Sequence, residues 1–546
     1  MGAKMKKKFI GVAAIVLALH LVFIIIYGTQ KIAFHEDEYF TYYTSAGYEG
    51  INPYGPIQEK SGMDIQRNFL VTDANRFDFA TVAAYQARDV HPPLYYLVMH
   101  FVMSLFPNQF YKWFGIALNA CCSLVACGGV MFFLYVMDAS RYRSFLALLG
   151  GLVYAVHPAM ITDVMFARMY CMSVMWVVLY MCVFVLLMRN LTGSWKRFFA
   201  LTLCGGAICY LAFLTHYFGL FVPFFLTLGF CLYGLLRKLI WKEKCLLRVL
   251  IYGGSLLAAI GLAVLTFPSA LHQIFVDEQG EGAFETLLHT DLFTMFRMFL
   301  PVLDKNFFAG MMYPVLGIFA VSLTAGVILL IRRSQKGDVI NKINYAILGI
   351  SLAAGMISVW LLSKTSMFLG DASSRYFYTA ASVLLPLMAY TICKAALQIT
   401  AFFSGRKNQG QLRAVFMAAL TGAVLLPVIA GHVQGNVLYL YQEKEETLSY
   451  ARENAGYPLV MVYDRDTRFK TWYIANELWP FERIIFVQYN DEETVLENEA
   501  LKTAEKLIVY MDGPEEVLDR MVAQNKNLSS WSLLRHDRHY YVYVLE

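Results

Sequence analysis

The chain has 546 residues, of which 58% are hydrophobic and only 16% are charged, whereas soluble globular domains contain about 45–50% apolar and about 25% charged residues. Together with a mean hydropathy of +0.50, this composition excludes an ordinary soluble protein and predicts an integral membrane protein. The formal net charge of +5 is small for the length, so the charge predicts no nucleic-acid partner.

The apolar runs predict the membrane spans. A transmembrane helix needs about 20 apolar residues, because the hydrocarbon core of a bilayer is about 30 Å thick. We predict eleven spans, at residues 9–27, 114–137, 145–160, 170–188, 199–215, 217–236, 249–267, 311–331, 344–362, 377–397 and 414–431. The shorter run at residues 93–106 is interpreted as an interfacial or re-entrant helix. The first run follows MGAKMKKKF and has no cleavage site of small residues after it, which indicates an uncleaved span.

The basic residues predict the orientation. With a cytoplasmic N-terminus, the inner segments carry 21 Lys and Arg, whereas the outer loops between residue 112 and the C-terminal region carry five. Because cytoplasmic loops are enriched in Lys and Arg, we expect a multi-pass protein of the plasma membrane. Its N-terminus would be cytoplasmic and its C-terminal region would lie outside.

Three segments outside the spans are too long to be simple connectors, at residues 28–113, 268–310 and 432–546. In the last of them, LVMVYD, RIIFV and KLIVYMD are typical of buried strands separated by helix-like stretches of about 10–20 residues. WSLLRHDRHYYVYVLE is typical of a closing hairpin. We therefore predict a polytopic α-helical membrane protein with about 11 transmembrane helices. Residues 1–431 would form a transmembrane catalytic domain, and residues 432–546 a small extracytoplasmic α/β domain.

The sequence HEDEYF comes directly after the first span. Three consecutive carboxylates at the mouth of a span are either a solvated cap or a site of proton chemistry. A carboxylate at this place can serve as a general base, and its neighbours can form a solvated or supporting face. Since consecutive residues point in different directions, HEDE is not a metal motif. We predict no metal-ligating set, although a divalent metal ion stays open as a cofactor.

Cations are scarce at the predicted outer face, which makes Arg168 and Arg375 informative. A guanidinium at the end of a span can bind a phosphate through two hydrogen bonds, or it can snorkel or form an ordinary ion pair. If the substrate is a sugar on a lipid phosphate, the leaving phosphate needs cations. The acceptor hydroxyl then needs a carboxylate base.

Five motifs together resemble the glycosyltransferase-C (GT-C) superfamily, and more narrowly the protein-mannosyltransferase-like bacterial membrane glycosyltransferases. They are HEDEYF, DVHPPLYY, ARMY, THYFG and SRYFY, and the resemblance covers roughly residues 5–400. It implies a polytopic enzyme that moves a sugar from a polyprenyl-phosphate carrier to an acceptor, usually with inversion. It also implies that Asp37 is the base and that the donor pocket is lined by His91, Arg168, Tyr170, His216 and Arg375.

One position departs from the family pattern. Relatives often have an acidic residue two positions before the Arg of ARMY, where this chain has Phe166. Asp163 lies one helical turn earlier, on the same face of a helix, and is a candidate substitute. The predicted catalytic residues are therefore Asp37, Glu38 and Asp163. Four further residues lie at the predicted outer face and are predicted to bind the donor, namely Arg88, Tyr217, Lys364 and Tyr376.

The expected partners are a polyprenyl-phosphate sugar donor, membrane lipid, and a glycan, lipid or protein acceptor. One alternative is a glycan ligase or polymerase that uses a diphosphate-linked lipid oligosaccharide. A transporter is a further alternative, but transporters place ionisable residues near the middle of the membrane. Here the main polar exceptions within the spans are His20 and Asn119.

Overall fold

The computed structural model describes residues 3–48, 57–289, 291, 293–334, 339–365, 370–402, 409–463, 470–471, 473–488, 498–512, 515–536 and 540–546. The chain forms two compact units. The first, called the helical unit, comprises Met1–Thr29, Gln86–Tyr95 and Gly115–Leu438. The second, called the mixed unit, comprises Gln30–Tyr85, Tyr96–Phe114 and Tyr439–Glu546. The predicted domain boundary between residues 431 and 432 stays a prediction.

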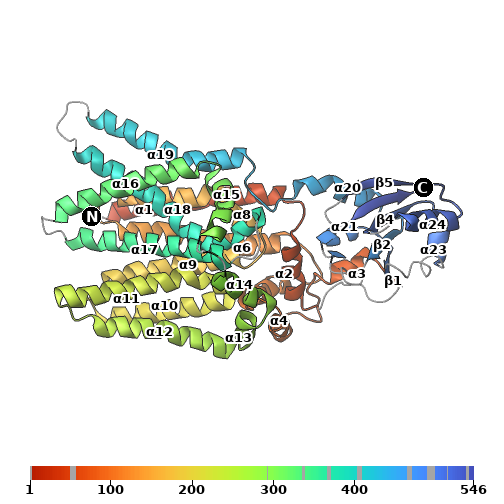
Figure 1. The fold of residues 1–546 in the computed structure, drawn as a ribbon, viewed down its shortest axis with the longest axis horizontal. Helices are drawn as coiled ribbons and strands as arrows, with labels where there is room; N and C mark the ends of the chain where they lie inside the picture. The colour runs from red at the N-terminus through yellow and green to blue at the C-terminus, as the bar shows by residue number, and fades with distance from the viewer. Residues whose placement is uncertain are drawn as a thin grey trace. The chain divides into compact units, whose positions relative to one another are not determined.

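Long apolar helices lie side by side in the helical unit (Figure 1). They are α1 (Ala3–Gln30), α6 (Trp113–Met137), α7 (Arg143–Val156), α8 (Pro158–Met165), α9 (Tyr170–Arg189), α10 (Trp195–Thr215), α11 (Phe221–Trp241), α12 (Leu246–Thr266), α16 (Met312–Ser334), α17 (Val339–Thr365), α18 (Tyr378–Phe402) and α19 (Gln409–Val433). Within the described residues, ten helices are long and apolar enough to cross a membrane, or eleven when the bent pair α7–α8 counts as one span. The predicted polytopic α-helical fold is confirmed.

Shorter helices connect the spans. They are α4 (Phe79–Gln86), α5 (Leu94–Ser104), α13 (Ser269–Phe275), α14 (Glu278–His289), α15 (Thr294–Phe308), η1 (Tyr217–Leu220) and η2 (Asp371–Phe377). Helix α5 has 11 residues, which at about 1.5 Å per residue reach about 16 Å. That is too short to cross a bilayer, so the exclusion of residues 93–106 from the spans is confirmed.

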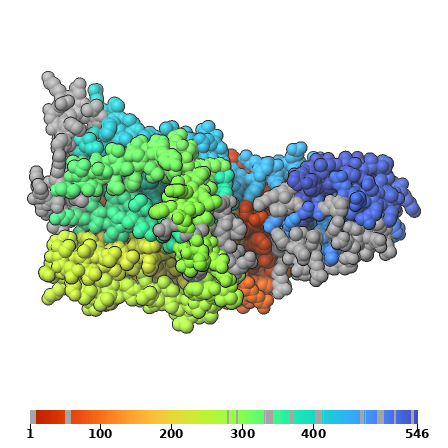
Figure 2. Space-filling view, in the orientation of Figure 1, coloured from red at the N-terminus to blue at the C-terminus, as the bar shows by residue number. Residues whose placement is uncertain are grey.

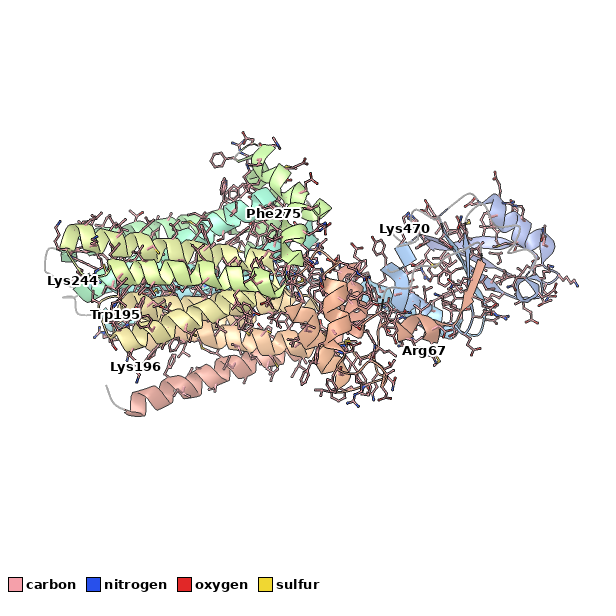
Figure 3. The ribbon with its side chains drawn as sticks, turned by 90° about the horizontal axis from the view of Figure 1, so that it is seen from below. Arg67, Trp195, Lys196, Lys244, Phe275 and Lys470 are labelled. Atoms are coloured by element: carbon pink, nitrogen blue, oxygen red, sulfur yellow. The ribbon has the colours of Figure 1, made fainter. Side chains whose placement is uncertain are left out.

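Basic residues mark one end of the bundle. Lys196, at the start of α10, and Lys244, before α12, lie at the same end in Figure 3, together with Trp195. Phe275, at the end of α13, lies toward the other end. This arrangement agrees with the alternation of basic and apolar connections along the chain. Which end is cytoplasmic stays a prediction.

The break between α7 and α8 is the sharpest interruption of a span, with a bend of 51°. Pro158 has no N–H for the carbonyl four residues earlier, so the helix cannot continue in register. His432 of α19 and His20 of α1 bind the carbonyls freed by the break. His20 Nδ1 donates to Ala155 O at 2.5 Å, and His432 Nε2 donates to Val156 O at 2.7 Å. The role of His20 is therefore to satisfy a carbonyl at a helix break.

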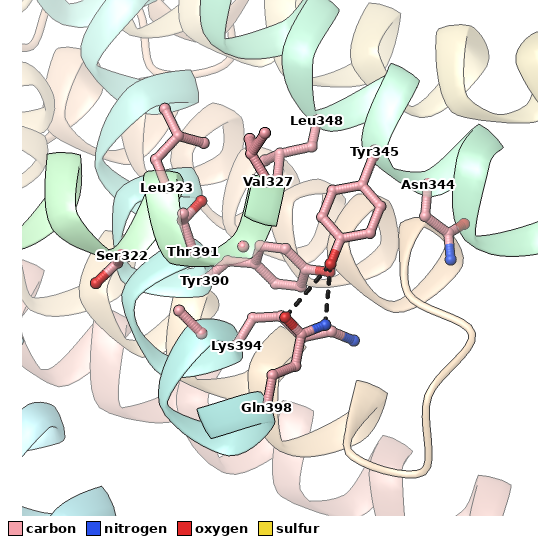
Figure 4. A pocket seen from close by; sticks show the side chains of 12 residues that line it. Ser322, Leu323, Val327, Asn344, Tyr345, Leu348, Tyr390, Thr391, Lys394 and Gln398 are labelled. Atoms are coloured by element: carbon pink, nitrogen blue, oxygen red, sulfur yellow. Dashed lines mark hydrogen bonds between the residues drawn. The ribbon is translucent and has the colours of Figure 1, made fainter. Parts of the chain in front are cut away.

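A small cavity of about 40 Å³ lies between α16, α17 and α18 (Figure 4). Tyr345 and Gln398 hydrogen-bond to each other at its edge. Lys394, which also lines it, forms an ion pair with the fully buried Asp138, with Nζ and Oδ2 2.5 Å apart. Lys394 lies 19 residues after Arg375, or about 28 Å along a helix. This cavity therefore belongs to the end of the bundle remote from Arg375.

The mixed unit contains a six-stranded sheet in the order β1-β3-β2-β4-β6-β5. Its strands are β1 (Ile57–Lys60), β2 (Leu459–Tyr463), β3 (Ile484–Gln488), β4 (Leu507–Met511), β5 (Trp531–His536) and β6 (Tyr541–Leu545). Strand β2 pairs in parallel with β3 and β4, and β5 pairs antiparallel with β6. The three predicted parallel strands and the closing hairpin are confirmed. Buried parallel strands tolerate continuous apolar runs, because both faces are covered.

Helices cover the sheet on both faces. Side chains of α23 (Glu499–Lys502) and α24 (Glu516–Gln524) join alternate residues of the central strands in one apolar cluster. On the opposite face, Tyr510 OH donates to Glu477 of α21 (Ala475–Leu478) at 3.1 Å, and Lys444 Nζ binds the same carboxylate at 3.0 Å. The predicted connecting helices fall partly on residues 464–469 and 489–497, which lie outside the described residues.

Strand β1 was not predicted from the sequence. It comes from the first long loop and pairs antiparallel with β3, and Glu59 forms an ion pair with Arg483 at 2.7 Å. Helix α3 (Gly62–Arg67) follows it, and a Cβ at Gly62 would lie 2.2 Å from the carbonyl oxygen of Trp479. Only glycine fits at this contact. The first loop and the C-terminal region therefore share one sheet and one core.

Candidate active site

Four basic side chains gather at helix junctions of the helical unit, and we call them the cation cluster: His91, Arg168, His216 and Arg375. His91 lies in the turn between α4 and α5, and Arg168 lies between α8 and α9. His216 lies between α10 and η1, and Arg375 lies in η2. Charged groups are costly inside a bilayer. A helix junction, at the end of a span, is a less costly position for such a group. The structure thus brings together four of the predicted donor-binding residues.

An acid and two bases lie in series at the core of the cluster. Asp89 Oδ2 is 3.6 Å from His91 Nδ1, and His91 Nε2 is 3.4 Å from Arg168 Nη2. The ring centroids of His91 and His216 are 6.0 Å apart. From the sequence alone, Asp89 lies at the predicted outer face and has no assigned role. Here it is the carboxylate that faces His91.

Aromatic rings support the other side of the cluster. The guanidinium carbon of Arg375 lies 5.7 Å from the ring centroid of Phe166 and 5.3 Å from that of Tyr376. Tyr170 stacks on Phe166 at 5.8 Å and also contacts His216 at 5.1 Å. A guanidinium over a ring keeps its N–H edge available for an acceptor. Phe166, the departure from the family pattern, is therefore an aromatic platform for Arg375.

Asn119 of α6 holds the turn that carries Arg168. Its Nδ2 donates to Phe166 O at 2.7 Å, and its Oδ1 accepts from Tyr95 OH at 3.0 Å. The end of α8 leaves carbonyls without helical partners, and the buried amide satisfies one of them. The second polar exception within the predicted spans is therefore also a support for a helix break.

Tyr217 holds the loop that carries Asp89 and His91. Its hydroxyl donates to Gln273 Oε1 at 2.6 Å, and Gln273 Nε2 donates to Asp89 O at 2.6 Å and to Gln86 O at 2.8 Å. Tyr217 thus acts on the cluster through α13. Its donor-binding role stays a prediction.

The remaining predicted residues of the helical unit differ in exposure. Asp163, on α8, is 1% exposed, and its Oδ1 makes no hydrogen bond within the part of the chain that the structure describes. Lys364 is buried in the last turn of α17, whereas Arg88 is exposed. The contacts that define the cation cluster do not include these three residues. Their catalytic and donor-binding roles stay predictions.

An apolar cavity of about 300 Å³ lies among α15, α16, α17 and α18. Phe307, Trp360, Phe377 and Met388 are among the side chains that line it. Figure 2 shows α15, α16 and α17 next to one another on the face of the bundle turned to the viewer. Because Phe377 follows Arg375 by two residues, the cavity begins close along the chain to the cation cluster.

The acidic triplet opens α2 (Glu36–Ala46) in the mixed unit. His35 is the N-cap, and its Nδ1 accepts from the backbone N of Asp37 at 3.1 Å. The Asp37 side chain is 22% exposed, with its Oδ2 3.7 Å from the same nitrogen. Glu38 is fully buried, and its Oε2 accepts from His35 N at 2.8 Å and binds Lys31 Nζ at 2.9 Å. Glu36 and Asp37 are both partly exposed, and the backbone N–H of Asp37 is held by the His35 cap.

The surroundings of the cluster lower the pKa of two groups, one a base and the other an acid. Burial, followed by the fields of the other three cluster members, lowers the pKa of His216 well below its ordinary 6.5. Burial alone would raise the pKa of Asp89, but His91 and Arg168 outweigh it and hold that pKa below its ordinary value. At neutral pH His216 is therefore neutral and Asp89 is ionised. Within the described residues, no three side chains of His, Cys, Asp or Glu lie close enough to hold a metal ion.

Solved structures of two glycosyltransferases resemble this one. ArnT from Cupriavidus metallidurans, bound to undecaprenyl phosphate or in the apo state, matches with TM-scores of 0.53 and 0.52 and identities of 13% and 14%, over 98% of both chains. The archaeal oligosaccharyltransferase AglB from Archaeoglobus fulgidus, in complex with an inhibitory peptide and a dolichol-phosphate, matches with a TM-score of 0.50 and 12% identity, over 96% of this chain and 72% of AglB. No protein-family model and no curated protein matches the chain. ArnT and AglB belong to the GT-C superfamily, so this chain has the GT-C fold.

The shifted pKa of His216 predicts acid sensitivity. Below about pH 6.5 an unfolded histidine binds a proton that the folded His216 does not bind, so the unfolding free energy falls as the pH falls. This loss is at most about 1.4 kcal/mol per pH unit. His216→Asn keeps an oxygen to cap η1 and removes the titration. Thermal unfolding in detergent, measured between about pH 7 and about pH 5, should show a shallower loss in the variant. Equal losses in both proteins would contradict the assignment.

Proposed function

We propose that this protein is a membrane glycosyltransferase that moves a sugar from a polyprenyl-phosphate carrier to an acceptor hydroxyl. The reaction would take place at the outer face of the plasma membrane, with inversion at the anomeric carbon. The observation that carries the proposal is the cation cluster, in which two arginines and two histidines from four helix junctions meet. Such a group suits a phosphate at the level of the lipid headgroups.

The apolar cavity supports a lipid-linked donor. Its lining is apolar throughout and comes from four neighbouring helices of the bundle, as a hydrocarbon chain requires. The GT-C fold agrees with this substrate class, since the ArnT structure it resembles was solved bound to undecaprenyl phosphate. The phosphate would then occupy the cation cluster, with the isoprenoid chain in the cavity.

The proposed chemistry balances without a cofactor. The acceptor oxygen forms a bond to the anomeric carbon, and the bond from that carbon to the phosphate oxygen breaks. The electron pair of the broken bond stays on the phosphate, where Arg168 and Arg375 would stabilise the added charge. The hydroxyl proton passes to the Asp37 carboxylate. Attack from the face opposite to the leaving phosphate gives inversion.

The polar residues within the predicted spans do not favour the transporter alternative. His20 and Asn119, the polar exceptions within the predicted spans, both bind backbone carbonyls at helix breaks. The likeness to AglB supports a second candidate, which is transfer from a diphosphate-linked oligosaccharide. Purified protein given radiolabelled polyprenyl-monophosphate sugars and, separately, a diphosphate-linked oligosaccharide should consume a monophosphate donor. Consumption of the diphosphate donor alone would favour the second candidate.

Arg168→Ala and Arg375→Ala should each raise the donor KM by about 10- to 100-fold, because each removes a charged hydrogen bond worth about 1.5–3 kcal/mol. Lys at either position should restore only part of the loss, since an ammonium cannot make two parallel hydrogen bonds. Arg297→Ala, at an exposed position on α15, is the matched control and should leave the donor KM unchanged. Donor saturation that is normal in both cluster variants would make these arginines structural anchors.

Asp37→Asn should lower kcat by at least about 100-fold, because the amide keeps the shape of the carboxylate but cannot accept the proton. The donor KM should stay normal or fall. Glu36→Gln is the matched control one residue away and should have little effect. Glu38→Gln should be intermediate, since it removes the ion pair with Lys31 but keeps an oxygen that can accept from His35 N. Normal turnover by folded Asp37→Asn would reject Asp37 as the base and direct attention to Asp163 or Asp89.

A further inference from the structure

The start of α2 depends on a buried ion pair. Lys31 and Glu38 are 1% and 0% exposed, and Lys31 Nζ lies 2.9 Å from Glu38 Oε2. The same ammonium donates to Tyr439 O at 2.7 Å. An ammonium is costly to bury unless its hydrogen bonds are met. Lys31 therefore joins the first turn of α2 to the start of the C-terminal region.

This ion pair is connected to Asp37 through two further contacts. Glu38 Oε2 also accepts from His35 N, and His35 Nδ1 accepts from Asp37 N, which completes a capping box. The backbone of Asp37 is thus held by a residue that Glu38 holds in turn. A change at Lys31 reaches Asp37 through three hydrogen bonds, by way of Glu38 and His35.

The segment that faces Lys31 has an unusual backbone. Tyr439 and Tyr441 have φ values of 64° and 53°, a left-handed conformation that is rare for bulky residues. It directs Tyr439 O at Lys31 and Leu440 O at Ile32 N, 2.7 Å away. The ring of Tyr439 also meets His35 edge-on at 5.6 Å. The strained backbone of Tyr439 and Tyr441 therefore lies at the contact with the first turn of α2.

Helix α21 of the C-terminal region binds Tyr39, the residue of α2 that follows Glu38. Tyr39, buried beside Glu38, donates its hydroxyl to Asn476 Oδ1 at 2.5 Å. Its ring lies 6.4 Å from that of Trp479, which also contacts Phe69 of the first loop at 5.6 Å. Helix α2 is therefore held by Tyr439 at its first turn and by Asn476 of α21 at Tyr39.

We propose that residues 439–546 are a positioning module of the active site, which holds α2 through Tyr439 and Asn476 so that Asp37 keeps its reactive orientation. Lys31 is the positioning residue that connects this module to α2. The proposal rests on the proposed function, since it needs Asp37 to be the base. It gives the C-terminal region a task in the chemical step that requires no binding of substrate.

Three changes test this module in the full-length protein. The double variant Lys31→Met/Glu38→Gln removes both buried charges together, so neither is left unpaired, and the oxygen of the new amide can still accept from His35 N. Misplacing a reacting group by about 1 Å can cost about 100-fold in rate, so we expect kcat to fall by about 10- to 100-fold with an unchanged donor KM. Tyr39→Phe, a milder change, should lower kcat by a smaller factor. Arg483→Gln breaks only the exposed ion pair with Glu59 and should leave kcat unchanged.

The test for coupling between the double variant and Asp37→Asn distinguishes a positioning role from a general loss of folded structure. If Lys31 and Glu38 act through Asp37, the double variant should lower kcat no further when Asp37→Asn is already present. A full additional loss, or a normal kcat in both the double variant and Tyr39→Phe, would overturn the proposal. If Asp37→Asn alone turned over normally, the proposed function would lose its base and the inference would fall with it. An impaired Asp37→Asn beside a normal double variant would reject the inference only.

Discussion

The hydrocarbon interior of a membrane offers no hydrogen-bond partner to a peptide group, so each interruption of a spanning helix has to be satisfied from within the protein. The helical unit meets this constraint with a few buried polar side chains. His20 and His432 bind the carbonyls of Ala155 and Val156, which the break between α7 and α8 leaves free, and Asn119 binds a carbonyl where α8 ends. These contacts turn two helix breaks into fixed features. The second break is the one that carries Arg168, so the geometry of the cation cluster depends on them.

The same constraint explains why the cluster is assembled from helix junctions. Charges within a span are costly, and a site with several cations must therefore collect them from separate turns. Arg375 rests on the aromatic ring of Phe166. A ring attracts the face of a guanidinium without neutralising its charge, whereas a carboxylate would neutralise it. The Asp89 carboxylate, which does contact the cluster, faces His91 instead.

The mixed unit solves a different problem, which is to hold a short helix that follows directly after a span. Its solution joins parts of the chain that are far apart, since Lys31 and Tyr439 are 408 residues apart in sequence and Tyr39 and Asn476 are 437 residues apart. Strand β1 and Gly62 bind the first loop to the sheet, and the Lys31–Glu38 ion pair binds the start of α2 to Tyr439. Within the acidic triplet, Glu38 is thereby buried in the fold, whereas Glu36 and Asp37 stay partly exposed. This difference between Asp37 and Glu38 arises from burial, since the two residues are chemically alike.

Local pattern by itself determined the membrane class, the spans and the central strands. Apolar runs of the right length have few alternatives in a bilayer, and buried parallel strands leave continuous apolar stretches. The scarcity of cations at the predicted outer face also marked Arg168 and Arg375, whereas His91 and His216 were implied by the family resemblance. Other features were decided only by the tertiary structure: the break at Pro158 and its histidine partners, the hydrogen bond from Gln273 to the loop of Asp89, the support of Arg375 by Phe166, and the place of β1 in a sheet built mostly from the C-terminal region. Each depends on contacts between residues distant in sequence, and a local pattern carries no record of which distant partner a carbonyl, a ring or an edge strand will meet.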